Sequence, residues 1–382
     1  MSIILIANLK SNMNSKKLKI CVITPRYTIA GVPLAQIRFA RALASMGHQV
    51  ELLIGRVEPD YKLPSVPNVN VLELNQNHVR GMLFAIWKYL ISVKPDVVFS
   101  AEDHLNSVVL LSAIFSGSQA KISCSSRVTP FDTYSSLVFS KRWVLKQLMR
   151  MVMWRADALT CVSKDMVEQY RLVFNSPSHV HVYNIVDDKN SRLLMKEPLI
   201  HEWAQNRDYK TIVAAGRLAP WKGFTDLIYA MKELSKRVQA RLIILGDGPQ
   251  RLELEDLIDR LGLGDLVKLK GYVDNPLKFF KNADVFVLSS YVEGLPNVLV
   301  EAMMCGCTPV STDCPTGPRE VLQNGKFGYL VPTNDPAAMA SAIEMALTHP
   351  IPKSLLAEAV RPFEEGVVLA RHFEVLGLAD RC

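Results

Sequence analysis

The sequence lacks an apolar run long enough to cross a bilayer. A membrane-spanning helix needs roughly 18–20 consecutive apolar residues, and no stretch of these 382 residues reaches that length. The apolar opening, residues 1–9, is too short to span and has no basic region before it, so it is a poor signal peptide. We expect a cytoplasmic protein in which residues 1–17 form a loose leader.

The chain also lacks a cysteine pattern that would hold a disulfide framework or a zinc ion. Its seven cysteines are an odd number at scattered positions, and disulfides are rare in the cytoplasm. Cys305, Cys307 and Cys314 lie close together in sequence but have no fourth ligand at zinc-site spacing. We therefore interpret them as small buried residues.

Acidic residues are scarce in the first half of the chain. Residues 1–190 hold 22 Lys and Arg against 13 Asp and Glu, whereas residues 191–382 hold 22 against 24. A basic half favours an anionic partner, such as a membrane surface, a lipid pyrophosphate or a nucleic acid. The sequence has no zinc motif and no aromatic–basic RNA-binding pattern, so we expect no nucleic-acid partner.

Strand-like apolar runs alternate with helical patterns in both halves. A strand at 19–25, a helix at 34–46 and a strand at 50–54 form a βαβ start, which predicts a parallel sheet. A second βαβ series begins with the strand at 210–215. The length suits two domains, and we place the linker at 187–197.

The most informative stretch of the sequence is 284–306. An apolar run at 284–290 predicts a buried parallel strand, and a turn with Glu293 and Gly294 follows it. Pro296 suits the first turn of a helix that continues to about residue 304. The start of this helix therefore lies at a strand's carboxyl end, where open α/β sheets bind ligands. Glu293 and Glu301 flank the turn and can each accept two sugar hydroxyls, although a solvated helix face is the plain alternative.

Cations follow the first strand of the second half. Gly216 and Arg217 end that strand, and Lys222 precedes the next helix. Two cations in a strand-to-helix loop suit a diphosphate. A later Gly-x-Gly, at Gly246, fails as a dinucleotide fingerprint because Arg251 occupies the third glycine's position.

Polar residues also follow strands in the first half. Glu102, Asp103 and His104 come directly after a strand at 95–100, which makes them site candidates. Arg127 ends another strand and either binds an acceptor phosphate or sugar carboxylate or forms a structural ion pair. The segment 136–155 predicts a basic amphipathic helix, which either lies on anionic lipid or packs in the core with a solvated basic face.

These motifs resemble retaining glycosyltransferases of family four. The similar stretches are 215–223, 246–249, 271–275 and the Glu-x7-Glu unit formed by Glu293 and Glu301, and they occur in the family's order. The loop at 313–320 resembles the bacterial surface-polysaccharide type. The resemblance covers the C-terminal half well and the N-terminal half more weakly.

The resemblance implies the α/β fold called GT-B, with two Rossmann-like doubly wound domains facing a central cleft. The expected parts are an acceptor-side domain at 18–188, a nucleotide-sugar domain at 189–354 and a helix at 355–382 that crosses back to the first domain. It also implies that Arg217 and Lys222 bind the donor pyrophosphate, Glu301 the ribose, Glu293 the donor sugar, and His104 the transferred sugar. The remaining donor contacts that it implies are Gly31, Gly216, Gly246, Tyr272, Val273, Gly294, Leu295, Pro296 and Asn297.

The expected activity is transfer of a hexose or N-acetylhexosamine from a nucleotide sugar to a glycan or lipid-linked acceptor. We favour a UDP-sugar over a GDP-sugar and expect no cofactor. The sequence contains no Asp-x-Asp, so we predict transfer without metal. The basic charge of the first domain suits a peripheral contact with the anionic inner face of the membrane. The alternatives are a GT-B sugar-nucleotide epimerase and a non-catalytic GT-B partner subunit.

Overall fold

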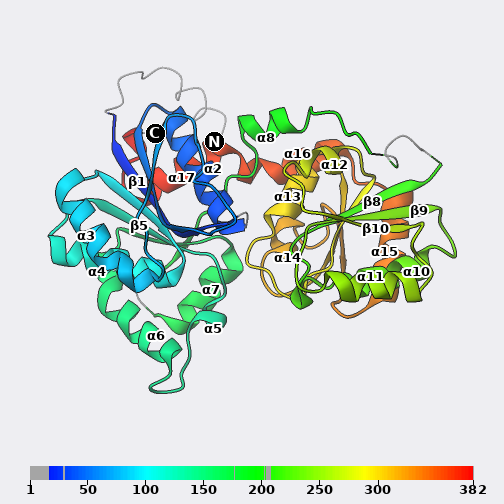
Figure 1. The fold of residues 1–382 in the computed structure, drawn as a ribbon, viewed down its shortest axis with the longest axis horizontal. Helices are drawn as coiled ribbons and strands as arrows, with labels where there is room; N and C mark the ends of the chain where they lie inside the picture. The colour runs from blue at the N-terminus through cyan, green and yellow to red at the C-terminus, as the bar shows by residue number, and fades with distance from the viewer. Residues whose placement is uncertain (1–16, 29–30, 176, 202, 204–207, 382) are drawn as a thin grey trace. The chain divides into compact units, whose positions relative to one another are not determined.

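The computed structural model describes residues 17–28, 31–175, 177–201, 203 and 208–381. The predicted leader therefore falls almost wholly outside the described residues. The chain divides into two compact units, one formed by the chain up to Ile185 together with the segment from Glu365, and the other formed by Val186–Glu364 (Figure 1).

The first unit contains, within its described residues, a seven-stranded parallel sheet in the order β3-β2-β1-β4-β5-β6-β7. Its strands are β1 (Lys19–Tyr27), β2 (Gln49–Val57), β3 (Val69–Glu73), β4 (Val97–Ala101), β5 (Lys121–Ser126), β6 (Ala158–Cys161) and β7 (Val180–His181). Its main helices are α2 (Gly31–Ser45), α3 (Met82–Val93), α4 (Asp103–Ser116), α5 (Pro130–Thr133), α6 (Lys141–Val152), α7 (Lys164–Val173) and α17 (Glu365–Val375).

The second unit contains a six-stranded parallel sheet in the order β10-β9-β8-β11-β12-β13. Its strands are β8 (Lys210–Ala215), β9 (Ala240–Leu245), β10 (Val267–Gly271), β11 (Val285–Leu288), β12 (Thr308–Thr312) and β13 (Tyr329–Val331). Its main helices are α8 (Lys189–Leu194), α10 (Phe224–Leu234), α11 (Arg251–Arg260), α12 (Leu277–Lys281), α13 (Asn297–Met304), α14 (Pro318–Val321), α15 (Pro336–Thr348) and α16 (Lys353–Val360).

Each sheet has the strand order of a doubly wound fold, as the sequence predicts. The strand order reverses between β1 and β4 in the first unit and between β8 and β11 in the second. In each case the two strands are adjacent and parallel. The central strands are buried on both faces; all four residues of β11, for example, are buried, which explains their continuous apolar runs. The fold class is confirmed as two Rossmann-like α/β units.

The tail of the chain differs from the single helix expected at 355–382. A short 3-10 turn, Arg361–Phe363, separates α16 from α17. Pro362 lies in that turn and has no N–H for a continuing helix. α16 lies in the second unit, whereas α17 buries Val368 and Phe373 in the core of the first. The chain therefore passes between units at 364/365, not at 354/355, and at 185/186, three residues before the linker position expected at 188/189.

The predicted helix at 136–155 is shorter than expected. α6 begins at Lys141, because the Ser140 hydroxyl caps it by accepting a hydrogen bond from Trp143 N at 3.1 Å. Before it, Phe139 has a φ of 63°, which a continuing helix does not permit. In the part of the chain that the structure describes, no helix is long and apolar enough to span a bilayer.

A histidine is buried where α17 meets the first sheet. The ring centroid of His372 lies 4.8 Å from that of Phe39 and 5.5 Å from that of Phe99. Burial, with a smaller effect of the Arg127 charge, lowers the pKa of His372 to about 3. The imidazole is therefore neutral in the folded unit at pH values where the unfolded chain already binds a proton.

We predict that replacing His372 with Phe makes folding less sensitive to acid. As pH falls below about 6.5, His372 becomes protonated in the unfolded chain but stays neutral in the folded one. Through this group the free energy of unfolding of the wild type falls by on the order of 2 kcal/mol between pH 7 and pH 5. Urea unfolding at both pH values measures the loss. The exposed His78→Phe variant is the control, and an unchanged pH dependence in His372→Phe contradicts the prediction.

Candidate active site

The strongest candidate site lies where the strand order of the second sheet reverses. β8 and β11 pair in parallel there, so the loops after their carboxyl ends diverge on opposite faces of the sheet. The loop after β8 carries Gly216, Arg217 and Lys222, and the loop after β11 carries Glu293. Residues that are 71 positions apart in sequence thus come together.

Lys222 and Glu293 form an ion pair across this point. Lys222 Nζ lies 2.5 Å from Glu293 Oε1, and the Ser290 hydroxyl donates to the same oxygen at 2.6 Å. The two charged side chains are only 19% and 11% exposed. Among the described residues, no partner contacts Glu293 Oε2, so this oxygen is available to a ligand hydroxyl. Lys222 has three donors and can hold Glu293 and a phosphate together.

The backbone fixes the Lys222 loop against the end of β11. The Ser289 hydroxyl donates to Lys222 O at 2.7 Å, and Tyr291 N donates to Trp221 O at 2.8 Å. Gly223 has a φ of +64°, and a Cβ there would lie 2.0 Å from Ser289 O. Only glycine fits this close approach, so it sets the position of Lys222.

A second glycine contact joins the ends of β8, β9 and β10. Gly246 has a φ of +133°, and a Cβ there would lie 2.0 Å from Gly216 O. Gly246 N donates to Gly271 O at 2.8 Å. Half-exposed Tyr272 and partly buried Val273 follow directly after β10. The predicted donor residues Gly216, Gly246, Tyr272 and Val273 therefore come from neighbouring strand ends.

The remaining predicted donor residues surround the start of α13. The helix begins at Asn297, and Pro296 precedes it as the N-cap. Leu295 and Pro296 are buried, while Gly294, Asn297 and Glu301 are partly buried. Glu301 lies one turn into the helix. This arrangement places a helix N-terminus and a carboxylate on one short helix, where Asn297 N and Leu299 N already donate to Leu295 O and Pro296 O.

The turn that carries Glu293 is supported by further residues, which the sequence analysis missed. The Thr316 hydroxyl donates to Glu293 O, and Gly317, with a φ of +89°, packs against Pro296 and Gly294 O. Tyr291 donates from its hydroxyl to Asp226 Oδ2 at 2.9 Å; burial and this bond raise the pKa of Tyr291 to about 12. The threonine and glycine of the 313–320 loop were the available signal, but a sequence does not show what they touch.

Arg217 differs from Lys222 in being exposed. Within the described residues it makes no hydrogen bond or ion pair. Its guanidinium is therefore unoccupied and follows the same strand end as Gly216. A fixed lysine and an unpaired arginine on one loop suit an anionic ligand, whose negative charge would pair with the arginine.

The first unit places its own candidates at the carboxyl ends of β1, β4 and β5. Gly31 is the first residue of α2, not part of the preceding loop, and a Cβ there would meet nothing within 4 Å. His104 is exposed in the first turn of α4. Glu102 is partly buried with a φ of +80°, and burial, opposed by the Arg127 charge, raises its pKa.

Asp103 is held inside the first unit. Its carboxylate accepts hydrogen bonds from the Ser126 and Tyr134 hydroxyls at 2.9 Å each, and from the Tyr170 hydroxyl at 2.7 Å. Burial raises the pKa of Asp103, although the three hydroxyls oppose the shift. A buried carboxylate with both oxygens occupied favours a structural role over the predicted acceptor contact.

Among the residues that the structure describes, the Arg127 guanidinium bonds to two amide side chains and forms no ion pair. Its guanidinium donates to Gln36 Oε1 at 3.2 Å and to Asn184 Oδ1. Burial lowers the pKa of Arg127 to about 10, and the Glu102 charge opposes the shift. These bonds attach β5 to α2 and to the end of the sheet, which favours the structural reading, and the predicted acceptor contact stays a prediction.

Comparison with known proteins agrees with this geometry. Residues 31–190 match the family Glycosyltransferase Family 4, and residues 195–362 match Glycosyl transferases group 1. The chain is 33% identical over 249 residues to an uncharacterized glycosyltransferase of Methanocaldococcus jannaschii, an alignment that covers 63% of this chain and 61% of that protein.

Two further comparisons cover more of the chain. It is 27% identical over 319 residues to N-acetylgalactosamine-N,N'-diacetylbacillosaminyl-diphospho-undecaprenol 4-alpha-N-acetylgalactosaminyltransferase of Campylobacter jejuni, covering 80% of this chain and 84% of that protein. The fold matches Anabaena HepE, solved in complex with UDP and glucose, with a TM-score of 0.72 at 18% identity over 94% of this chain and 99% of that one.

The fold and these matches define the class as a GT-B protein. Within that class, the two family matches, one on each half, and the curated relatives support a family-4-like glycosyltransferase. Among the described residues no group of three His, Cys, Asp or Glu side chains stands ready to hold a metal ion. Metal independence and the individual roles of the site residues stay predictions.

We predict that Gly246→Ala destabilises the second unit. Its Cβ would overlap Gly216 O on a backbone that other residues rarely adopt, which costs on the order of 3 kcal/mol or forces the two strand ends apart. Urea unfolding measures the change. Gly264→Ala is the matched control, since its Cβ would enter open space. Equal unfolding of the two variants would show that the strand ends tolerate separation.

Proposed function

We propose that the protein transfers a hexose or N-acetylhexosamine from a nucleotide sugar to a glycan or lipid-linked acceptor, with retention of configuration and without metal. The observation that carries this proposal is the Lys222–Glu293 ion pair at the point where the sheet order reverses, beside unengaged Arg217. Cation, carboxylate and helix start lie on neighbouring loops, which is the set of groups that a sugar diphosphate needs.

Each group has a proposed role. Lys222 and Arg217 bind the donor diphosphate and stabilise the negative charge that grows on the leaving nucleotide. Glu293 keeps Lys222 in position through Oε1 and accepts a donor-sugar hydroxyl through Oε2. Glu301 accepts the ribose hydroxyls, and the backbone N–H groups at the start of α13 contact the donor. His104 contacts the transferred sugar from the first unit.

The proposed donor is a UDP-sugar and the proposed acceptor belongs to surface-polysaccharide synthesis. HepE, whose fold this chain shares, was solved with UDP and glucose, and exposed Tyr272 offers a ring on which a base can stack. The Campylobacter jejuni relative acts on a diphospho-undecaprenol-linked sugar. A lipid-linked acceptor places the protein at the inner face of the membrane.

We predict that Lys222→Gln and Glu293→Ala weaken donor binding by about tenfold or more, because hydrogen bonds to charged groups contribute roughly 1.5–3 kcal/mol each. Thermal shift against UDP-, GDP- and ADP-sugars, with and without EDTA, measures binding. Lys236→Gln, in the exposed turn after α10, is the control. Unchanged donor affinity in both site variants would refute the assigned roles.

The products separate the alternatives. A glycosyltransferase releases nucleotide only when acceptor is present, and the sugar leaves the nucleotide. An epimerase converts the donor without acceptor, and its product stays nucleotide-linked. A non-catalytic subunit binds donor without turnover. A donor shift that EDTA abolishes would contradict metal independence.

The segment 137–154 around α6, here called the tip, offers a specific surface for the membrane contact. Its side chains Leu137, Phe139, Met151 and Trp154 are 73%, 86%, 66% and 67% exposed. Lys141 and Lys146 lie on the same helix, and residues 133–156 contain no Asp or Glu. Exposed apolar side chains beside uncompensated cations fit an anionic lipid surface. Leu145 and Met149 form the opposite, buried face, which anchors the helix.

We predict that Phe139→Ser/Met151→Ser loses binding to vesicles of phosphatidylglycerol and phosphatidylcholine by about tenfold or more, because each apolar side chain gives up burial in the lipid. Co-sedimentation at two salt concentrations measures binding and its electrostatic part. Phe84→Ser, equally exposed but on α3, is the control. Sedimentation of the double variant at the wild-type level would exclude this tip as the contact.

A further inference from the structure

A second polar pocket lies in the second unit, formed by residues outside the donor site. It has a volume of about 510 Å³, within the usual range for small-molecule sites. Its lining residues are Asp187, Arg192, Met195, Lys196, Lys281, Met304, Ala357, Val360 and Glu364. They come from the segment around α8, from the last residues of α12 and α13, and from α16 and the turn after it. Met304 is at the opposite end of α13 from the donor motif.

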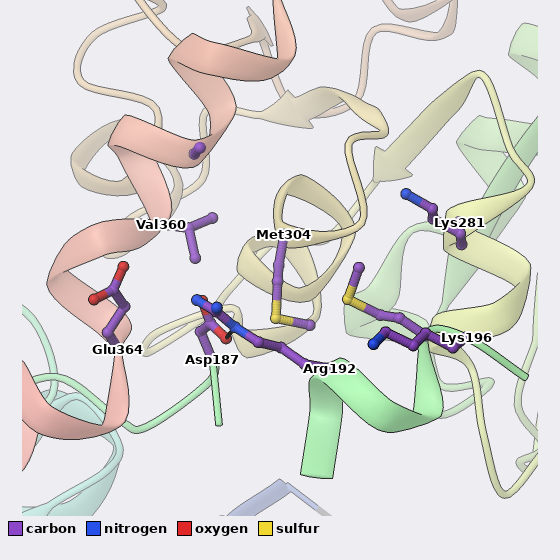
Figure 2. Close-up of a pocket in the computed structure, with 9 residues that line it drawn as sticks. Asp187, Arg192, Lys196, Lys281, Met304, Val360 and Glu364 are labelled. Carbon is purple, nitrogen blue, oxygen red and sulfur yellow. Dashed lines mark hydrogen bonds and ion pairs between the residues drawn. The ribbon is translucent and has the colours of Figure 1, made fainter. Parts of the chain in front are cut away.

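The pocket has an uncompensated cationic side. Figure 2 shows Lys196 and Lys281 on its right, Glu364 on its left, and Met304 and Arg192 between them. Within the described residues, neither lysine forms a hydrogen bond or ion pair through its ammonium group. Lys281 is the last residue of α12 and Lys196 follows α8 by two positions. The C-terminal partial charge of a helix is at most about half an elementary charge, less than the full charge of each lysine.

Arg192 is fixed in place and does not add a free charge. It forms a bidentate pair with buried Asp187, at 2.6 and 2.7 Å. Asp187 raises the pKa of Arg192 through this pair, and the Glu364 charge adds a smaller effect. The guanidinium and the Asp187 carboxylate therefore largely neutralise each other, and the two lysines determine the sign of the ligand on their side.

The floor between the charged sides is apolar. Met195, Met304 and Val360 line it, and methionine side chains adapt to ligands of different shape. The pocket also touches both places where the chain passes between units, since Asp187 pairs with Glu364 in a parallel bridge and Asp187 N donates to Phe363 O at 3.2 Å. A ligand here would contact both connecting segments from the side of the second unit.

We propose that this pocket binds a phosphate monoester that carries a short apolar group. Lys196 and Lys281 hold the phosphate, and the apolar group covers Met195, Met304 and Val360. The site is separate from the donor diphosphate site and does not depend on the proposed transfer. A soluble phosphate ester and a phosphatidic acid headgroup present the same chemistry to the two lysines.

The test measures binding of hexyl phosphate and inorganic phosphate by calorimetry. We expect hexyl phosphate to bind more tightly than inorganic phosphate, and Lys196→Gln/Lys281→Gln to weaken hexyl phosphate by about tenfold or more through the loss of charge-assisted bonds. Lys270→Gln, on an exposed position of β10, is the matched control. Lys222→Gln removes the donor-site cation and should leave hexyl phosphate binding unchanged, whereas loss in that variant would place the ligand in the donor site instead.

A parallel co-sedimentation experiment with phosphatidic acid vesicles distinguishes a soluble ester from a lipid headgroup. If the protein binds hexyl phosphate in solution, the ligand is a free ester. If the protein sediments with the vesicles and only the double lysine variant no longer does so, the ligand is a lipid headgroup bound at the same pocket. Equal affinity of the wild type and Lys196→Gln/Lys281→Gln for both probes overturns the proposal. Urea unfolding confirms that the double variant is folded.

Discussion

The ion pair between Lys222 and Glu293 is the contact on which the candidate site depends. It exists only because β8 and β11 are neighbours although β9 and β10 come between them in the chain. It also requires Gly223, since any side chain there would collide with Ser289 O and displace the lysine. The sheet topology and one glycine conformation therefore place a cation and a carboxylate within 2.5 Å in a mostly buried position, where their interaction is stronger than at the surface.

The sequence predicted the architecture because the strands are buried on both faces. Runs such as 285–288 and 242–245 read as continuous apolar segments, and such segments, alternating with helical patterns, permit few arrangements other than parallel sheets. Element ends were less predictable. The start of α6 depends on one Ser140 cap, and the break before α17 depends on Pro362. Single residues of this kind do not change the periodicity on which the prediction rested.

The same distinction separates the site residues that sequence predicted from those it missed. Motif residues after β8, β9 and β11 come together because parallel strands end at one edge of a sheet. Ser290 and Thr316 were missed, since their role is to hold Glu293 and nothing in the pattern shows that contact. The pattern alone placed Asp103 at a strand end. The hydroxyls that donate to its carboxylate belong to Tyr134 and Tyr170, which come from distant segments of the chain.

The charge balance of the site bears on how it would distinguish a sugar nucleotide from a simple anion. Arg217 and Lys222 carry two positive charges, and Glu293 and Glu301 carry two negative charges, so the cluster as a whole is close to neutral. Net attraction to a diphosphate is therefore weak beyond a Debye length. In the proposed function, binding therefore depends on directed hydrogen bonds, with the cations facing phosphate and the carboxylates facing hydroxyls. Free diphosphate satisfies only the first half of this set and leaves both carboxylates without hydroxyl donors, which favours the complete donor over its anionic part.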